Sequence, residues 1–391
     1  MGTGTHELAC HHCGAVFRRV PLEPGESSRC LRCDSVLESY SRFSAREWLA
    51  IVIATGIVFI LANAFPEVTL FVQGKGQAAS LIDAVRVTWE SGYPEVAAMT
   101  FAAGFLLPLA HICLLFWILG ALAFGRLPVF FKESLHLLDA LLPWCMVPVF
   151  LMGVLVAVVK MAGLASLVPG IGLFATAVLA VFITMLTGLS SHKLLTMAHD
   201  MGLDAPVEKT PLAPTPALFA RTWALILAAC IMYLPANFLP IMEIASIGGA
   251  SSHTILGGVI ELYGMGSWDI ALVVFIASVA VPIFKIVALS TLVFLAQVRS
   301  TSQLKQRTQL YKVVEFIGQW SMLDVFVVIL LSALGRFGNL LTIKPSGGAA
   351  AFGCVVVLTM LAAMGFDPRL AWRRAGHRRH LSSQRANITL N

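Results

Sequence analysis

Residues 268–297 read WDIALVVFIASVAVPIFKIVALSTLVFLAQ, and this run indicates a membrane protein. Apart from Asp269 at its start, the run contains a single charged side chain, Lys285. A helix of about 20 apolar residues is long enough to cross the hydrocarbon layer of a bilayer. A transmembrane strand would instead alternate apolar and polar residues over about ten positions. The run therefore predicts a membrane-spanning helix.

The composition of the whole chain agrees with this interpretation. Of the 391 residues, 58% are apolar and only 12% are charged, whereas a soluble domain carries about 25% charged residues. The formal net charge of +6 comes from basic residues beside the apolar runs and at the C-terminal end, so it does not indicate nucleic-acid binding. Residues 1–40 lack the short apolar core of a secretory signal, and we expect the first helix to act as its own membrane anchor.

Seven further apolar runs bring the expected number of spans to eight, and we expect an all-α polytopic membrane protein. The expected spans are 48–65, 96–124, 140–160, 169–189, 218–240, 268–297, 316–336 and 348–366. The expected domains are a ribbon at 1–41, four-helix units at 42–200 and 218–375, a proline-rich linker at 201–217 and a disordered basic tail at 376–391.

Basic residues set the expected orientation in the membrane, because Lys and Arg collect on the cytoplasmic side. They are frequent before the first span, in alternate loops and after the last span, whereas the loop 241–267 has none. Both termini are therefore expected in the cytoplasm and the loops 66–95 and 241–267 in the periplasm. The expected localisation is a bacterial inner membrane.

The two halves of the chain repeat one another. Ala62-Asn63-Ala64-Phe65-Pro66 recurs as Ala236-Asn237-Phe238-Leu239-Pro240, and Pro108 matches Pro282 at the same offset of 174 residues. Each half holds four expected spans, an even number, so the repeats should be parallel rather than inverted. Segments 68–72, 243–247 and 339–343 have β character, and we expect them to pair as a small periplasmic sheet on each half.

Four cysteines near the N-terminus have the spacing of a structural zinc site. Cys10 and Cys13 form one C-x2-C pair, and Cys30 and Cys33 form the second, sixteen residues later. Four thiolates complete a tetrahedral shell around one Zn²⁺ and leave no open position, so a structural site is expected. The alternative is a pair of redox dithiols, which the reducing cytoplasm disfavours.

Lys285 is the principal functional candidate inside the membrane. A charge at the centre of a span costs roughly 2.5–3.5 kcal/mol on insertion scales, so such residues are commonly functional. Asp324, about two turns into the seventh expected span, is the obvious partner, and the alternative is a purely structural ion pair. His111 occupies the matching position in the first half, where ordinary packing of a neutral imidazole is the favoured interpretation. Ser321 could form a hydrogen bond across helices.

Six other polar or turn-forming residues have structural interpretations beside functional ones. Lys160 and Arg336 match one another near the outer ends of two spans, where snorkelling to the interface would explain them. Asn63 and Asn237 are expected to cap the turn from span to loop. Pro66 and Pro240 then end the helices.

Together these motifs resemble the paraquat-inducible protein A family of inner-membrane proteins. The residues that carry the resemblance are the two Cys pairs, 61–66 (LANAFP), 257–262 (GGVIEL), 320–326 (WSMLDVF) and 366–372 (FDPRLAW). The resemblance implies a partner with MCE domains, whose periplasmic assemblies form lipid tunnels, and it implies phospholipid transport. Many family members carry a second ribbon, but the linker 201–217 of this chain contains no cysteine.

Three kinds of function follow as hypotheses. The first is a subunit that passes lipid between the membrane and a periplasmic tunnel, with a proton coupled through Lys285 and Asp324 as a candidate energy source. The second is a scaffold that anchors the MCE partner and transports nothing. The third is a membrane enzyme such as a thiol oxidase, which would need a paired periplasmic dithiol. The remaining four cysteines lie singly in apolar runs, so the chain is not expected to be an enzyme.

Overall fold

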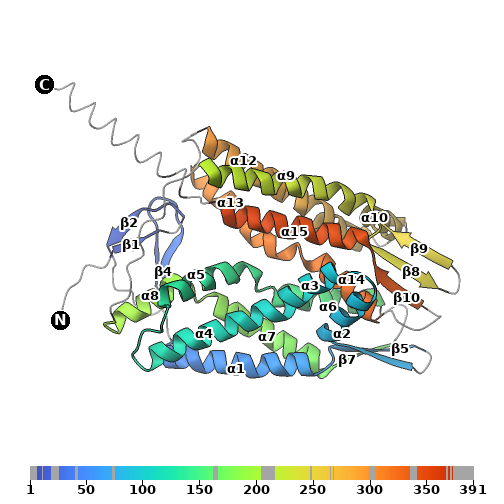
Figure 1. Cartoon of the computed structure of the whole chain (residues 1–391), viewed down its shortest axis with the longest axis horizontal. Helices are drawn as coiled ribbons and strands as arrows, with labels where there is room; N and C mark the ends of the chain where they lie inside the picture. The colour runs from blue at the N-terminus through green and yellow to red at the C-terminus, as the bar shows by residue number, and fades with distance from the viewer. Residues whose placement is uncertain are drawn as a thin grey trace.

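Helices running along one long axis form an elongated bundle with β-structure at both ends (Figure 1). The computed structural model describes residues 7–10, 12–18, 26–39, 43–72, 75–161, 166–203, 216–246, 249–264, 266, 268–298, 304–334, 341–366, 369 and 372. At one end lies the N-terminal β module, which we call the ribbon (residues 7–39). It consists of two antiparallel hairpins, β1 (Glu7–Ala9) with β2 (Val16–Arg18) and β3 (Ser27–Arg29) with β4 (Val36–Ser39).

The first half of the chain follows the ribbon. Its elements are α1 (Ala45–Ala64), β5 (Val68–Val72), β6 (Lys75–Ala79), α2 (Leu81–Glu90), α3 (Pro94–Phe101), η1 (Ala102–Leu106), α4 (Leu107–Ala123), α5 (Phe131–Leu141), η2 (Leu142–Trp144), α6 (Val147–Met161), β7 (Ser166–Pro169), α7 (Ile171–Thr187) and α8 (Ser191–Asp200). The start of α1 is fixed by a capping box, in which Ser44 and Glu47 each accept a hydrogen bond from the other's backbone N–H.

The second half has a similar succession of elements. They are α9 (Pro216–Phe238), β8 (Met242–Ser246), β9 (Gly249–His253), α10 (Ile255–Gly264), α11 (Trp268–Phe275), η3 (Ile276–Ala280), α12 (Val281–Gln297), α13 (Leu304–Trp320), α14 (Leu323–Leu334), β10 (Leu341–Pro345) and α15 (Gly347–Gly365). The expected linker and tail lie largely outside the described residues, which omit 204–215 and 373–391.

Six helical stretches of the described chain are long and apolar enough to cross a bilayer. They are Ala45–Ala64, Pro94–Ala123, Phe131–Val158, Leu218–Phe238, Ile276–Gln297 and Gly347–Gly365. A seventh candidate is the pair Ile171–Thr187 and Ser191–Asp200, whose axes meet at 62°. The remaining expected span, 316–336, falls on the end of α13 and on α14, which has only 12 residues. The count of eight spans therefore stays a prediction.

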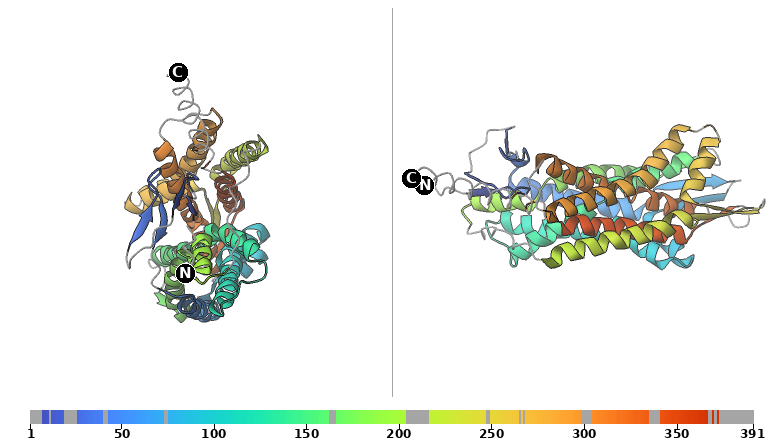
Figure 2. Two further views of the ribbon diagram at one scale, coloured as in Figure 1. Left: turned by 90° about the vertical axis from the view of Figure 1, so that its left-hand side faces the viewer. Right: turned by 90° about the horizontal axis from the view of Figure 1, so that it is seen from above.

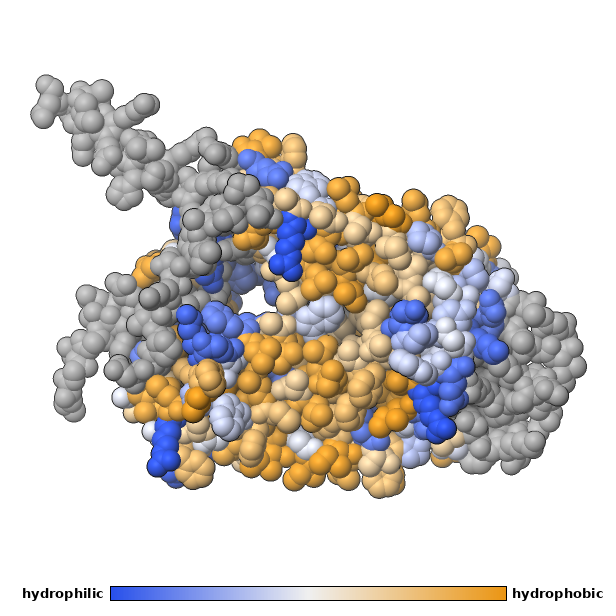
Figure 3. Space-filling view, in the orientation of Figure 1, coloured by the Kyte–Doolittle hydropathy of each residue, from blue (hydrophilic) through white to orange (hydrophobic). Residues whose placement is uncertain are grey.

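The middle of the bundle presents an apolar surface to its surroundings. Figure 3 shows a broad hydrophobic zone over the helices, with hydrophilic side chains gathered toward the two ends. Many large apolar side chains of the helices are exposed, among them Ile60 (66%), Phe174 (64%) and Ile231 (67%). Soluble monomers rarely expose apolar patches of this extent. The chain is therefore a membrane protein whose helices face lipid.

Two three-stranded antiparallel sheets lie at the end of the bundle opposite the ribbon (Figure 1). Strand β5 is central in the first sheet, in the order β6-β5-β7, and β8 is central in the second, in the order β10-β8-β9. The strand expected at 68–72 is β5, and those expected at 243–247 and 339–343 are shifted by one and two residues to β8 and β10. A hairpin and a distant strand thus build each sheet.

Other features recur at the spacing of the sequence repeat. A π-helical turn occurs at Ala102–Leu106 and again at Ile276–Ala280, and each is followed by a proline in the first turn of the next helix. Viewed along the long axis, the blue-to-green helices gather on one side and the yellow-to-red helices on the other (Figure 2). The arrangement as two parallel four-helix repeats stays a prediction.

The two halves meet where α6 packs against α14. The rings of Phe150 and Phe326 contact edge to face there, with centroids 5.4 Å apart and planes at 83°. A Cβ added at Gly153 would lie 3.0 Å from the Cβ of Phe326, so the glycine allows the two helices to approach closely. The core of the molecule is therefore continuous across the halves.

One glycine in each half allows the segment before the sheet to pack against the helix that follows the last strand of that sheet. The N–H of Gly172 donates to the carbonyl of Pro66 (3.1 Å), and the N–H of Gly348 donates to the carbonyl of Pro240 (2.9 Å). A Cβ at Gly172 would lie 2.7 Å from the Pro66 oxygen, and one at Gly348 would lie 2.5 Å from the Pro240 oxygen. Such distances are too short for any real carbon–oxygen contact, so only glycine fits.

Gly172→Ala and Gly348→Ala are each expected to destabilise the protein by about 1–3 kcal/mol, because the new methyl group forces the backbone apart. Thermal unfolding in detergent should show a lower midpoint for both variants. Gly120→Ala is the matched control, since a Cβ there meets nothing within 4 Å and alanine favours the helix. Unchanged midpoints for Gly172→Ala and Gly348→Ala would show that these turns are not tightly packed.

Candidate functional site: a cysteine cluster and a buried lysine

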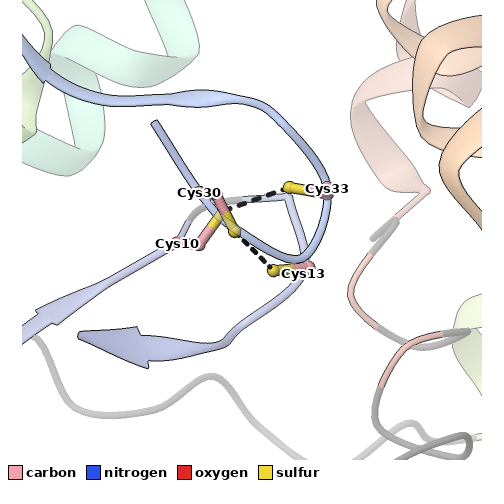
Figure 4. A group of neighbouring side chains, drawn as sticks. All are labelled: Cys10, Cys13, Cys30 and Cys33. Carbon is pink, nitrogen blue, oxygen red and sulfur yellow. Dashed lines mark hydrogen bonds between the residues drawn. The ribbon is translucent and has the colours of Figure 1, made fainter. Parts of the chain in front are cut away.

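Four cysteine side chains converge between the hairpins of the ribbon (Figure 4). Cys10 and Cys13 lie in the turn after β1, and Cys30 and Cys33 lie in the turn after β3. The Sγ of Cys10 is 3.5 Å from that of Cys33, and the Sγ of Cys13 is 3.4 Å from that of Cys30. All four sulfurs lie within 4.8 Å of one another, and all four residues are buried.

These distances suit a tetrahedral metal ion. With Zn–S bonds of about 2.3 Å, the sulfurs of a tetrahedral site are about 3.8 Å apart. Each pair sits in a tight turn, in which Gly14 N–H donates to Cys10 O and Asp34 N–H donates to Cys30 O, both at 2.8 Å. Gly14 and Asp34 adopt left-handed backbone conformations with φ near +67° and +60°. The two C-x2-C turns therefore aim their sulfurs at one point, as the spacing predicted.

Burial also affects the protonation of these thiols. Desolvation raises the pKa of the Cys10 thiol to about 11 and raises that of Cys13 as well. The pKa of the Cys33 thiol is instead lowered, because its desolvation is outweighed by hydrogen bonds with Ser35. Cys10 and Cys13 therefore stay protonated near neutral pH unless a cation replaces their protons. The cluster therefore has the donors, the geometry and the burial to hold a metal ion.

Lys285 is buried in the second half, as its position in the run 268–297 predicted. Its side chain is 1% exposed, on α12. The Nζ lies 3.4 Å from the Oγ of Ser321, which sits at the break between α13 and α14 and is 3% exposed. The structure thus brings together two of the predicted polar residues. The side chain of Asp324 lies outside the described part of the chain, so the Lys285–Asp324 pair stays a prediction.

His111 is the counterpart of Lys285 in the first half. It is fully buried on α4 at 0% exposure. Neither ring nitrogen has a hydrogen-bond partner among the described residues. A buried imidazole nitrogen without a partner loses hydrogen bonds to water that nothing replaces. The role of His111 stays a prediction.

The other predicted membrane residues are only partly described. Lys160 belongs to α6 near its end, but its side chain lies outside the described part, and Arg336 lies outside it entirely. Asn63 and Asn237 each donate a side-chain hydrogen bond of 2.9 Å to the carbonyl four residues earlier in the same helix. The two residues therefore make the same bond in each half, just before Pro66 and Pro240.

Glu67 is a buried acid that the sequence did not single out. It follows Pro66 at the start of the first sheet, is 3% exposed, and accepts a hydrogen bond of 3.0 Å from Thr176 Oγ1 on α7. Its Oε2 has no hydrogen-bond partner among the described residues. Burial raises the pKa of this carboxyl to about 7. A single acidic residue in a loop ordinarily faces water, and its neighbours in the sequence do not indicate the contact with distant α7.

Glu67→Gln is expected to stabilise the protein at alkaline pH and to have little effect in acid. Because the folded pKa of about 7 lies above the ordinary value, ionisation destabilises the folded state as pH rises from about 4.5 to 7. Each pKa unit corresponds to 1.36 kcal/mol, so the gain should approach about 3 kcal/mol above pH 8 and vanish below pH 4. Thermal midpoints of both proteins measured across this range test it, and a pH-independent difference would contradict it.

Long apolar helices, a buried lysine and a cysteine cluster with metal-site geometry define a polytopic membrane protein with an N-terminal metal-type module. A model of the family described as paraquat-inducible protein A matches residues 45–196 and 219–376. The chain therefore belongs to the paraquat-inducible protein A family, as its motifs predicted.

Named relatives extend along nearly the whole chain. The "Intermembrane transport protein PqiA" of Escherichia coli (strain K12) is 32% identical, over 96% of this chain and 98% of that protein. The "Probable intermembrane transport protein" of Haemophilus influenzae is 29% identical, over 94% and 95%. The "Lipophilic envelope-spanning tunnel protein A" of E. coli K12 is 27% identical, over 93% and 90%. The comparison with solved structures gives no match.

Proposed function

We propose that this protein is the inner-membrane subunit of an intermembrane lipid transport system. It would pass phospholipids between the bilayer and a tunnel formed by a periplasmic protein with MCE domains. The observation that carries the proposal is the near full-length similarity to proteins named for intermembrane transport and for an envelope-spanning tunnel. The exposed hydrophobic zone over the helices supports the proposal, because a subunit that loads lipid must itself lie in the membrane.

Lys285 is the residue on which the proposed transport depends. Its ammonium group is held away from lipid and water beside Ser321. We assign Asp324 as its partner, one turn beyond the break at Ser321, and a proton exchanged at this pair would couple transport to an energy source. Ionisable groups inside membrane proteins commonly serve as proton relays.

The proposed cofactor is one structural Zn²⁺ held by Cys10, Cys13, Cys30 and Cys33. The burial of all four sulfurs supports a structural site, since a catalytic zinc keeps one position open to water. The ribbon would lie in the cytoplasm, where thiols stay reduced. The two three-stranded sheets, at the opposite end of the bundle, would face the periplasm and the MCE partner.

Co-purification tests the proposed partnership. The full-length protein, extracted in a polymer that retains native lipid, should carry an MCE-domain protein and phospholipid that mass spectrometry can identify. Partner without stoichiometric lipid would favour a scaffold that only anchors the tunnel. The proposal would be overturned if the purified protein carried no MCE-domain partner and no more lipid than an unrelated membrane protein with a similar number of spans.

The orientation makes a separate prediction. A reporter active only in the periplasm, inserted in the loop 241–267, should give a strong signal, and the same reporter at the N- or C-terminus should give none. The matched reporter active only in the cytoplasm should give the reverse pattern. A cytoplasmic signal from 241–267 would overturn the eight-span topology, because both ends of the expected spans 218–240 and 268–297 would then be wrongly placed.

A further inference from the structure

Trp372 lies where the ribbon meets the second half of the chain. It ends the FDPRLAW motif at 366–372, which the proposed transport does not use. The side chain is 6% exposed, and its Nε1 donates a hydrogen bond of 3.0 Å to Thr308 Oγ1 on α13. On the other side the indole belongs to one buried apolar cluster with the four ribbon cysteines, and Leu304 packs against that cluster.

Arg32 holds the same tryptophan from the ribbon side. It lies between Cys30 and Cys33, inside the second C-x2-C turn. Its guanidinium carbon is 4.9 Å from the centroid of the Trp372 ring, and its Nη2 donates to the Trp372 carbonyl at 3.1 Å. A guanidinium over an indole is an attractive cation–π contact. One turn of the ribbon therefore contacts both the ring and the backbone of Trp372.

The connectivity makes this contact a bridge. The ribbon continues along the chain into α1 and so belongs to the first half, whereas Leu304, Thr308 and Trp372 belong to the second half. The bridge lies at the ribbon end of the bundle, far along the axis from the two sheets (Figure 1). The halves are thus joined at this end by a module that is covalently attached to one half and docked on the other.

We propose that the ribbon is a metal-dependent clasp, which closes on Trp372 and α13 when the cysteine cluster holds zinc and releases them when it does not. The proposal rests on the zinc site proposed above. Two of the ligands flank Arg32, so the bound metal fixes the turn that positions the guanidinium. Without the ion, small modules of this type lose their fold. Docking would then be weaker, because it would include the loss of conformational entropy on ordering the turn.

In such a clasp, zinc binding and the docking of Trp372 must affect one another. If zinc strengthens the docking of Trp372 by some factor, docking must strengthen zinc binding by the same factor. A ribbon that is merely a neighbour of Trp372 would show neither effect. Coupling between two sites is typically worth a factor of about 5–150, so we expect shifts of about tenfold.

Two measurements on the full-length protein in lipid nanodiscs test this. Hydrogen exchange of residues 304–312 should be about tenfold faster after zinc is stripped with a chelator, and reloading zinc should restore it. Trp372→Ala should bind zinc about tenfold more weakly in competition with a chromogenic chelator, and Arg32→Ala should show a smaller shift in the same direction. Neither readout depends on lipid transport, so the failure of the transport proposal would leave the test intact.

Matched controls separate the clasp from general destabilisation. Arg29→Ala removes a ribbon arginine that pairs with Asp34 (3.6 Å), and Trp117→Ala removes an indole that is 56% exposed on α4. Both should keep wild-type zinc affinity and exchange. Unchanged exchange at 304–312 on zinc removal, or wild-type zinc affinity in Trp372→Ala, would overturn the clasp. A protein that takes up no zinc at all would overturn both the clasp and the zinc site.

Discussion

Replacing Lys285 by alanine is expected to abolish lipid transport while leaving the protein in the membrane. Lys285 is 1% exposed, and Ser321 lies 3.4 Å from its Nζ. If Asp324 is its partner, removing the ammonium group leaves a carboxylate without a counter-charge in a medium of low dielectric. That costs several kcal/mol unless the carboxylate takes up a proton. Either outcome removes the charge pair on which the proposed coupling depends.

The measurement is the sensitivity of cells to detergent when the variant and its MCE partner are the only such system present. Lys285→Ala and Asp324→Ala should each be as sensitive as the deletion. Lys305→Ala is the matched control, because that side chain is exposed at the start of α13. Membrane levels must be compared by immunoblot, since a misfolded variant would also give a sensitive strain.

A double variant distinguishes chemistry from structure. Lys285→Met with Asp324→Leu replaces both charges by apolar side chains of similar size, which is often neutral or stabilising for a buried ion pair. If the pair acts in transport, this variant should fold and remain inactive. If the pair is only structural, the double variant should keep both folding and activity. Wild-type resistance in a well-expressed Lys285→Ala protein would contradict the functional assignment outright.

The second large effect concerns the metal. Purified wild-type protein should contain about one zinc per chain, and Cys10→Ser with Cys13→Ser should contain almost none, because two ligands cannot hold the ion against buffer. The ribbon should then lose its structure, which protease cleavage within residues 7–39 would reveal. Elemental analysis by mass spectrometry gives the stoichiometry directly.

Another pair of cysteines supplies the control for this experiment. Cys113 and Cys230 lie exposed on α4 and α9, outside the ribbon. Cys113→Ser with Cys230→Ser removes the same number of thiols and should retain one zinc. A full zinc content in the Cys10→Ser, Cys13→Ser protein would rule out the proposed site, and zinc loss in both double variants would show that the effect is not specific.

The features that sequence predicted well are those that depend on local spacing. Two residues between cysteines are enough to place both sulfurs in one turn, and the turns at Cys10 and Cys30 have the expected form. Lys285 was predicted to lie at the centre of a span, because about twelve apolar-dominated positions flank it on each side and make it difficult for the side chain to reach water. The strand at 68–72 follows from its β-forming residues and from the proline before it.

Features that depend on tertiary contacts were not predictable in this way. Glu67 accepts a hydrogen bond from Thr176, which lies 109 residues away in sequence, and Arg32 donates one to Trp372 across 340 residues. The number of spans also depends on where helices break, and a hydropathy average over many residues does not reveal such breaks. Such breaks occur at Ser321–Met322 between α13 and α14, and at the 62° bend after α7.

Lipid flux tests the central claim most directly. Liposomes containing the protein and a fluorescent phospholipid should transfer that lipid to the purified MCE-domain partner, whose tunnel would shield the label from a soluble quencher. The proposal predicts transfer with the wild-type protein and with Lys305→Ala, and only the background rate of empty liposomes with a folded Lys285→Ala protein. Equal transfer from wild-type, Lys285→Ala and empty liposomes would contradict it.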